Sequence, residues 1–431
     1  MSNPESKQLV FMPNVEGLAH IIRSAVLAES MSKIGYKCKI IIPVEHSKIV
    51  SKIAKNLIIE TVKFDDNPAQ LFRDVAEEYG KSNTVSRSNY EKLTKPYLHE
   101  LNKYPDAVAI VDSHPFARAA AVLNNMNNIW IGTPAAMPYM SHIPGLTKSL
   151  AGRASSKIVI SLLAKATYNF LYIIYKYMGE DGYSKKITVK DVIEDTAQVP
   201  KLVFTTKNTV CFEADKPNFY MSEPLFSKLE IGHESDILRY KKLIDNRKSI
   251  YISFGGTGYS PVMIKKLIMA LLKKGFVVLC SRGTILKPGD LEDHPNLLIE
   301  DFIPGLPAAL AVDLIVSHGS QGTVEQALVT NTPLIAFPFN LDQIISVGSA
   351  NKPNIVNYAQ LDFLKISKIS NPSRMSQYIE SISIDKIMSS INKLCLIDEV
   401  KPSLGTIKQL NNVRIRRATK ILEEILAKYF N

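Results

Sequence analysis

The strongest constraint on the fold is a regular alternation of short apolar runs and helical stretches, which is clearest in the second half of the chain. Ser260 and Pro261 form a good N-cap and first helical residue, and Gly275 ends the helix that follows. Strands that alternate with helices pair in parallel, and the helices cover both faces of the sheet. The alternation in the second half of the chain therefore predicts a doubly wound parallel sheet. Its predicted strands are 249–254, 276–280, 313–317 and 333–338.

The first half shows the same alternation, with helices predicted at about 20–33 and 116–126. Its predicted strands are 8–13, 38–43, 106–112 and 129–134. At roughly 100–200 residues per domain, a chain of 431 residues forms two or three units. The predicted fold class is α/β, with two doubly wound Rossmann-like domains. The predicted boundaries are 1–225 for the first domain, 226–248 for a linker, 249–405 for the second domain, and 406–431 for a C-terminal helix that can pack back on the first domain.

Composition excludes several classes of protein. Hydrophobic residues make up 46% and charged residues 22% of the chain, which excludes a disordered protein. The cysteines lie far apart without a CxxC pair, which argues against a disulfide framework or a zinc module and fits a reducing, cytoplasmic compartment. The net charge of +11 suits an anionic partner such as a nucleotide or phospholipid headgroups. Because the lysines are spread along the whole chain, nucleic acid is not an expected partner.

The longest apolar stretch, 158–178, is interrupted by Lys165, Asn169 and Lys176. A spanning helix needs about 20 mostly apolar residues, so a buried or lid-like helix is the favoured prediction. Its tyrosines suit an interface, and together with the positive charge they predict at most a peripheral contact with an anionic membrane.

Two loops in the second half, 255–258 and 318–322, are rich in Gly, Ser and Thr and lead into helix N-termini. Free backbone N–H groups and the helix dipole make such places anion sites. In a doubly wound sheet, ligands bind beyond the carboxyl ends of the strands, where loop 14–19 and Asp112 also lie. A single glycine loop is often only a tight turn, but two in one half, one beginning with His318, favour a phosphate-bearing ligand between them.

The run 302–343 closely resembles the donor-nucleotide signature of the family 1 glycosyltransferases, which reads approximately HGGxGTxxEALxxGxPxxxxPxxxDQ. Weaker similarity covers most of the chain, and the bacterial macrolide-glycosyltransferase branch is the most similar. The resemblance implies two facing Rossmann-like domains of the GT-B type, with the acceptor on the first domain and a nucleotide sugar on the second. The positions in register with the signature are His318, Gly319, Gly322, Thr323, Ala327, Leu328, Pro333, Pro338, Asp342 and Gln343.

The same resemblance implies roles in donor binding. His318 would donate to a diphosphate oxygen, the backbone of Ile303 would meet the nucleobase, and Asp342 and Gln343 would bind sugar hydroxyls. Preorganised donors and a helix dipole can stabilise the departing diphosphate without a metal, so the expected requirement is a UDP-sugar co-substrate and no cofactor. The implied donor-binding residues are Gly256, Thr257, Ile303, His318, Gly319, Gly322, Thr323, Gln326, Asp342 and Gln343.

His20 falls on the histidine of the family's N-terminal motif and would be the general base. It would take the proton of an acceptor hydroxyl as that oxygen attacks the anomeric carbon and inverts it. An imidazole suits this role because its reference pKa, about 6.5, lies near working pH. Asp112 would orient the ring and stabilise the imidazolium. The alternative is that His20 is only a helix cap and Asp112 an N-cap.

Several positions depart from the family pattern. The glutamate that would grip the ribose hydroxyls aligns with Gln326, whereas Glu325 lies one residue earlier, about 100° round the helix. An amide can bond a hydroxyl but without the charge assistance of a carboxylate. Ala19 and Arg23 replace the usual Gly and Pro around the histidine. These changes bear on donor affinity and sugar choice more than on the fold.

The leading hypothesis is an inverting transferase that moves a hexose-type sugar from a UDP-sugar, with TDP-sugars second, to a hydroxyl of a hydrophobic or lipid-like acceptor. The alternative is a catalytically degenerate homologue that binds a nucleotide sugar and regulates or scaffolds a partner. A sugar-nucleotide epimerase is a third possibility, less favoured because the Asp342–Gln343 pair belongs to the transferases. The acceptor site would be built from first-domain loops, about 65–100 and 135–180.

Overall fold

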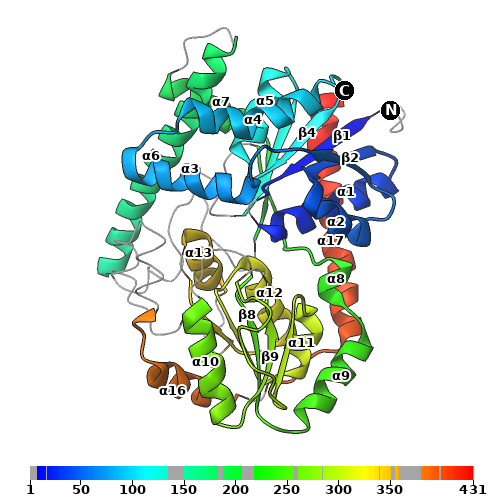
Figure 1. Ribbon diagram of the computed structural model, residues 1–431. Coiled ribbons are helices and arrows are strands. Elements are labelled where there is room, and N and C mark those ends of the chain that lie inside the picture. The colour runs from blue at the N-terminus through cyan, green and yellow to red at the C-terminus, as the bar shows by residue number, and fades with distance from the viewer. Residues whose placement is uncertain are drawn as a thin grey trace.

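The computed structural model has two α/β domains, one above the other in Figure 1, and a long C-terminal helix beside both of them. The first domain, in blue to green, lies at the top and contains both termini of the chain. The residues described are 7–15, 17–133, 150–182, 188–205, 218–255, 261–283, 285–338, 340–350, 355–358, 380–397 and 399–430.

The first sheet has seven strands among the described residues, all parallel, in the order β3-β2-β1-β4-β5-β6-β7. The chain runs from β1 to one edge and then returns to the other side of β1, so the topological switch point lies between β1 and β4. The predicted strands of this half are confirmed. The bounds are β1 Gln8–Pro13, β2 Lys37–Pro43, β3 Ile58–Val62, β4 Val108–Asp112, β5 Asn128–Gly132, β6 Lys201–Phe204 and β7 Phe219–Ser222.

Helices cover both faces of this sheet, as a parallel sheet requires. One core packs α1 against the sheet through Ile21, Leu27 and Met31, and another packs α4 and α5 on the opposite face through Tyr97 and Ala120. The helices of this domain are α1 Leu18–Lys33, the 3-10 turn η2 Val44–His46, α2 Ser47–Ile53, α3 Pro68–Ser82, α4 Arg87–Leu101, α5 Pro115–Leu123, α6 Leu150–Glu180 and α7 Val189–Gln198.

The second sheet has six strands in the described part of the chain, also all parallel, in the order β10-β9-β8-β11-β12-β13. Its switch point lies between β8 and β11, and the four strands predicted in this half are confirmed. The strand bounds are β8 Ser249–Ser253, β9 Val277–Ser281, β10 Leu297–Glu300, β11 Leu314–Ser317, β12 Leu334–Ala336 and β13 Val356–Tyr358.

The helices of the second half include two in the stretch 226–248, where a linker was predicted. Tyr240 and Ile244 of α9 pack into the core of the second sheet with Ile315 and Val324, so α9 is part of that domain. The bounds are α8 Lys228–Ile231, α9 Glu234–Ile244, α10 Pro261–Lys273, α11 Gly305–Ala311, α12 Gln321–Thr330, α13 Leu341–Ser349 and α16 Ile384–Leu394.

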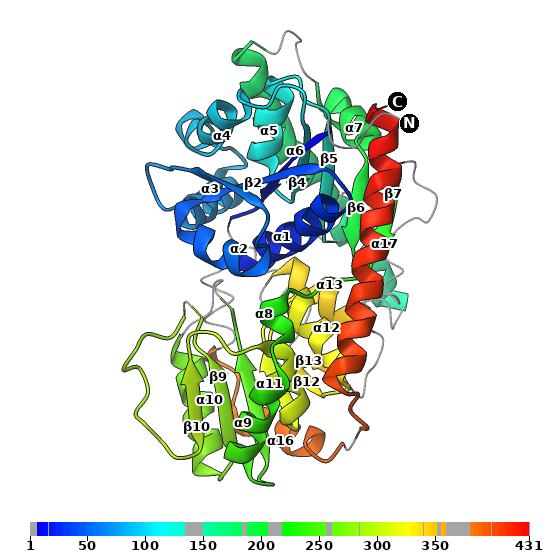
Figure 2. The ribbon, with the colours of Figure 1, turned by 90° about the vertical axis from the view of Figure 1, so that its right-hand side faces the viewer.

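The last helix, α17 (Leu404–Phe430), runs along both domains, as Figure 2 shows. Its first turns pack Leu404 and Ile407 against the second domain. Its later turns bury Leu422 and Ile425 in the core beneath α1 and β1. The helix therefore ties the two domains together through apolar contacts at each end.

The described part of the apolar segment packs one face against the first domain. On α6, Ile174 and Met178 are fully buried against α3, α4 and α5. The Tyr177 hydroxyl donates to the Val85 carbonyl at 2.7 Å. No helix in the described ranges is long and apolar enough to cross a membrane.

Candidate active site

The two residues predicted to form the catalytic pair meet at the switch point of the first sheet. His20 is the third residue of α1, and Asp112 is the last residue of β4. Because β1 and β4 are adjacent, with Pro13 opposite Asp112, the helix that follows β1 begins beside the end of β4. The backbone N–H of Asn14 donates to the Asp112 carbonyl at 2.9 Å and fastens the two strand ends together. Ninety-two positions apart in sequence, the two side chains are brought into contact by strand order alone.

The His20 ring is held at one nitrogen and open at the other side. Its Nδ1 lies 2.9 Å from Asp112 Oδ1. Asp112 is fully buried, whereas 23% of the His20 side chain is exposed. When Nδ1–H donates to the carboxylate, Nε2 carries the free lone pair that a general base needs. Gly17 leaves space here, since a Cβ at that position would lie 3.3 Å from the ring carbon Cδ2 and 3.9 Å from Nε2.

Arg23, a departure from the family pattern, joins this pair. Its Nε donates to Asp112 Oδ2 at 2.9 Å, its terminal nitrogen donates to Oδ1, and the same nitrogen lies 3.0 Å from His20 Nδ1. The Ser24 hydroxyl adds a bond to Oδ2 at 3.3 Å. Burial alone would raise the pKa of Asp112, but the charges of Arg23 and His20 and their hydrogen bonds outweigh it and lower this pKa to about 2. Asp112 is therefore a carboxylate at any physiological pH.

His114, close to the pair in sequence, has a structural role. It is fully buried between the rings of Phe72 and Tyr97, and its Nδ1 accepts from the Ala117 N–H at 3.1 Å to cap α5. Burial lowers the pKa of His114 to about 3, so this ring stays neutral.

In the second domain, His318 lies directly after β11 at the switch point of its sheet. The side chain is 93% buried, since its exposed fraction is 7%. Burial lowers the pKa of His318 to about 4, against the opposing effect of a hydrogen bond with the Ser253 backbone. The ring lies close to Gly255, where a Cβ would sit 3.2 Å from its Cε1. A neutral ring fixed this way can offer a hydrogen bond but is unsuited to carry charge.

The glycine after this histidine is required by space as well as by backbone conformation. Gly319 has φ +77°, and a Cβ there would come within 2.5 Å of a Val347 methyl carbon. The Ser317 hydroxyl accepts from the Gly319 N–H at 2.9 Å and shapes the turn into α12. Gly322 and Thr323 occupy the first turn of α12, where N–H groups lack helical partners. The start of α12 therefore presents N–H groups at the place where the sequence predicts a diphosphate site.

The neighbouring pair Glu325 and Gln326 point to different partners. Glu325 is buried against α17, with its carboxylate 2.6 Å from the Arg414 guanidinium. Burial raises the pKa of Glu325 in spite of that arginine. The Gln326 amide lies against Gly305, where a Cβ would approach its Oε1 to 2.4 Å. Gln326 is thus beside the segment that carries Ile303, the residue expected at the nucleobase, whereas Glu325 is engaged elsewhere.

Ile303 itself is anchored in the core. Its side chain is buried with Ala308 and Val324, and its carbonyl accepts from the Tyr251 hydroxyl at 3.4 Å. Gly256 and Thr257, predicted in the phosphate loop, lie outside the described residues.

Contacts between the domains bring the predicted catalytic residues of the first domain and the predicted donor-binding residues of the second domain to one interface. Asp342 Oδ1, expected at the sugar, accepts from the Thr133 hydroxyl at 2.6 Å, and Thr133 directly follows β5. Gln321, the first residue of α12, donates to the Phe204 carbonyl. The Phe204 ring in turn lies 5.3 Å from the Arg23 guanidinium. Gln343 is nearly fully buried, and its N–H donates to the Asn340 side chain at 3.0 Å, which caps α13.

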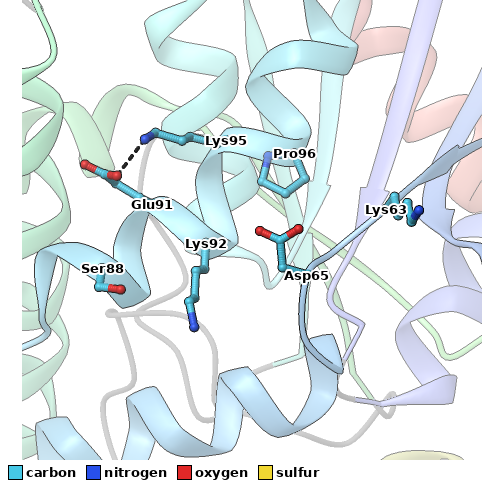
Figure 3. A pocket seen from close by; sticks show the side chains of 7 residues that line it. All are labelled: Lys63, Asp65, Ser88, Glu91, Lys92, Lys95 and Pro96. Atoms are coloured by element: carbon cyan, nitrogen blue, oxygen red, sulfur yellow. Dashed lines mark hydrogen bonds and ion pairs between the residues drawn. The ribbon is translucent and has the colours of Figure 1, made fainter.

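A surface pocket of about 390 Å³ lies apart from this interface, between α4 and the loop after β3. It falls partly in the stretch 65–100, where acceptor contacts were predicted. Figure 3 shows that its lining is dominated by charged side chains. Lys95 pairs with Glu91 at 2.6 Å, and Lys92 pairs with Asp66 at 2.7 Å. Such a lining does not suit a hydrophobic acceptor. The stretch 134–149 and residues 183–187 lie outside the described ranges.

Sequence comparisons give partial matches to glycosyltransferases. Over 149 residues the chain is 25% identical to the NDP-glycosyltransferase YjiC of Bacillus subtilis (strain 168), covering 34% of this chain and 36% of that protein. Over 95 residues it is 36% identical to a UDP-N-acetylglucosamine–N-acetylmuramyl-(pentapeptide) pyrophosphoryl-undecaprenol N-acetylglucosamine transferase of Prochlorococcus marinus, covering 20% and 27%. The matches thus span about a third of these proteins. No family model matches the chain.

Structural comparisons extend over the whole chain. The glycotransferase of kitacinnamycin aligns with a TM-score of 0.60 at 14% identity, covering 97% of this chain and 98% of the other. CalG4, the calicheamicin glycosyltransferase, aligns with a TM-score of 0.60 at 15% identity, covering 99% and 100%. The chain has the GT-B fold of these glycosyltransferases. The fold class predicted from the sequence is thereby confirmed, and the partial sequence matches agree with the predicted resemblance to glycosyltransferases.

Three residues at or near the interface between the domains, Arg23, Thr133 and Gln321, had no functional role in the sequence-based prediction. Arg23 stood out as a substitution in the histidine motif, and its position three residues after His20, on the same helix face, was a usable signal. Thr133 and Gln321 offered none, because their partners belong to the other domain. In the part of the chain that the structure describes, no group of three or more His, Cys, Asp or Glu side chains could hold a metal ion.

Proposed function

We propose that this GT-B protein is an inverting glycosyltransferase that moves a hexose-type sugar from a UDP-sugar to a hydroxyl of a hydrophobic or lipid-like acceptor. The observation that supports this most is the His20–Asp112 contact, placed at the switch point of the first domain in a fold whose matched relatives are glycosyltransferases. A second-domain loop with a buried neutral histidine at a helix N-terminus supports a diphosphate there.

In the proposed reaction, the acceptor O–H lies at Nε2 of His20. The hydroxyl oxygen attacks the anomeric carbon from the face opposite the diphosphate, the C–O bond to the diphosphate breaks, and the proton passes to Nε2. Asp112 holds Nδ1–H and offsets the charge of the imidazolium. The leaving UDP keeps the electron pair, and the N-terminus of α12 and His318 stabilise its growing negative charge.

The donor can be tested before any acceptor is known. Nucleotide sugars that bind the folded state raise its melting temperature, so a thermal-shift screen should select UDP-sugars over TDP-, GDP- and ADP-sugars. Release of UDP in the presence of an alcohol acceptor separates a transferase from a homologue that only binds the donor. Binding of the donor without transfer to any of a broad set of hydrophobic alcohols would favour the regulatory alternative.

The acceptor class is proposed from the printed names of similar proteins. The Prochlorococcus relative carries the name of a transferase acting on a pyrophosphoryl-undecaprenol, and two structural neighbours carry the names of kitacinnamycin and calicheamicin glycosyltransferases. With a net charge of +11, contact with anionic membranes would be peripheral. Such binding to anionic vesicles should be released by high salt, and binding that persisted at every salt concentration would contradict it.

A further inference from the structure

Arg23 and Asp112 form a buried, two-point ion pair at the centre of the candidate site. The guanidinium reaches both carboxylate oxygens, through Nε to Oδ2 at 2.9 Å and through its terminal nitrogen to Oδ1. Arg23 is 7% exposed and Asp112 fully buried. Charges in such a place are weakly screened by salt, and a guanidinium keeps its proton throughout the working range. The negative charge that His20 faces is therefore already matched by a positive one.

The nitrogen Nδ1 of His20 has two partners that require opposite roles. Asp112 Oδ1, at 2.9 Å, can only accept, and the Arg23 terminal nitrogen, at 3.0 Å, can only donate. The tautomer that can act as a base carries Nδ1–H, which donates to Asp112, so Arg23 makes its bonds to the carboxylate and not to the ring. Protonation of Nε2 would then place a second cation with its Nδ1 only 3.0 Å from the guanidinium nitrogen. Charge repulsion from Arg23 therefore acts against the imidazolium.

The other groups around His20 do not change this balance. Ser24, on the same helix, donates to Asp112 Oδ2 at 3.3 Å and carries no charge. His114, on the loop after β4, is within electrostatic range of His20 but is kept neutral by burial. Among the described residues that contact His20 or Asp112, Arg23 therefore supplies the positive charge.

We infer that Arg23 is a positioning residue that offsets the charge of Asp112 beside His20, so that replacing Arg23 by a neutral residue makes the His20 imidazolium more stable than it is in the wild type. The inference rests on the proposed function, in which His20 is the general base. A family-typical proline at position 23 could not have this effect.

A charge cycle on the two partners tests the inference without any substrate. The imidazole of His20 is titrated by NMR in the wild type, Arg23→Gln, Asp112→Asn and the double variant, with its signal assigned by loss in His20→Gln. A nearby charge shifts a titration midpoint by about one to three pH units, so Arg23→Gln should raise the midpoint by at least about one unit. Asp112→Asn should lower it, and the double variant should return close to the wild type. A midpoint unchanged or lowered in Arg23→Gln overturns the inference.

Arg23→Gln leaves Asp112 unpaired, so this variant can fail to fold. The set of variants still tests the inference in that case. Asp112→Asn and the double variant differ only at Arg23, and the double variant should titrate at least about one unit higher. Equal midpoints in those two proteins would refute the effect of Arg23. Arg23→Lys, which keeps the charge, should hold the midpoint close to the wild-type value.

The kinetic counterpart separates positioning from a merely structural role. At saturating donor and acceptor, the acid limb of the kcat profile should move to higher pH in Arg23→Gln and stay in place in Arg23→Lys. A purely structural Arg23 would lower kcat at every pH without moving the limb. If the wild type transfers no sugar, the proposed function fails, but the NMR titration still decides the role of Arg23.

Discussion

The switch points of the two sheets each hold a histidine, but their surroundings are opposite in kind. His20 is partly exposed and touches two charged groups, Asp112 and Arg23. His318 is buried against Gly255 and bonds the backbone of Ser253, and burial lowers its pKa to about 4. In the first environment the ring is open to solvent on one side while the Asp112 carboxylate holds its orientation. The second keeps a ring neutral and fixed, which is why the proposed function assigns the general base to His20 and a hydrogen-bond donor to His318.

The largest expected effect comes from removing the base. His20→Ala should reduce transfer to an alcohol by roughly 10²–10⁴, the usual contribution of a positioned general base. UDP affinity should stay within about twofold, because the donor would lie on the second domain. Transfer rates at saturating donor, with UDP affinity from calorimetry, provide the measurement. If His20→Ala transferred sugar at the wild-type rate, His20 would be a structural cap, and the proposed difference in role between His20 and His318 would be wrong.

Removing the second histidine should give the opposite pattern. His318→Ala takes away a donor to the diphosphate, and a bond to a charged group contributes about 1.5–3 kcal/mol, so UDP should bind about tenfold or more weakly. Calorimetry on the folded variant, with circular dichroism to confirm folding, measures this. His20→Ala is the matched control from the other domain. Unchanged UDP affinity would contradict the assignment of the diphosphate site.

The pair Glu325 and Gln326 sharpens the description of the second domain. If Gln326 meets the ribose, Gln326→Glu should bind UDP at least as tightly as the wild type, since a carboxylate makes stronger bonds to hydroxyls. Glu325→Gln should leave UDP affinity nearly unchanged but lower the free energy of unfolding by about 1–3 kcal/mol, because it leaves Arg414 without this buried partner. Marked loss of UDP binding in Glu325→Gln alone would reverse the two roles.

The smallest effect concerns the pH dependence of folding. The pKa of His318 is about 4 in the folded protein and near its ordinary 6.5 in the unfolded chain. Between these values the unfolded chain binds more protons, so stability is present above pH 6.5 and is lost as the pH falls toward 4. His318→Gln should weaken this dependence in urea unfolding measured from pH 4 to 7. An unaltered dependence would mean that His318 titrates normally.

The fold was predictable because its signals are local. Strand-length apolar runs predicted eight of the thirteen described strands within a few residues, as at β8, and alternation with helices implied parallel pairing. The final helix and its packing against the first domain were predicted, and Ile425 is buried there. Its contact with the second domain through Leu404 was not predicted. The stretch 226–248 was predicted as a linker, whereas Tyr240 and Ile244 of its helix α9 pack into the second domain, a contact between elements that the sequence alone did not show.

The sequence by itself determined which loops lie at the carboxyl ends of strands and that His20, Asp112 and His318 are there, because strand order and motif spacing carry that information. Only the tertiary structure decided the partners. Arg23 pairs with a carboxylate 89 positions away, and Glu325 turns to Arg414 on the last helix. Asp342 meets Thr133 across the two domains. Side-chain contacts between elements depend on how sheets and helices pack in three dimensions, and the spacing of residues along one chain does not record that packing.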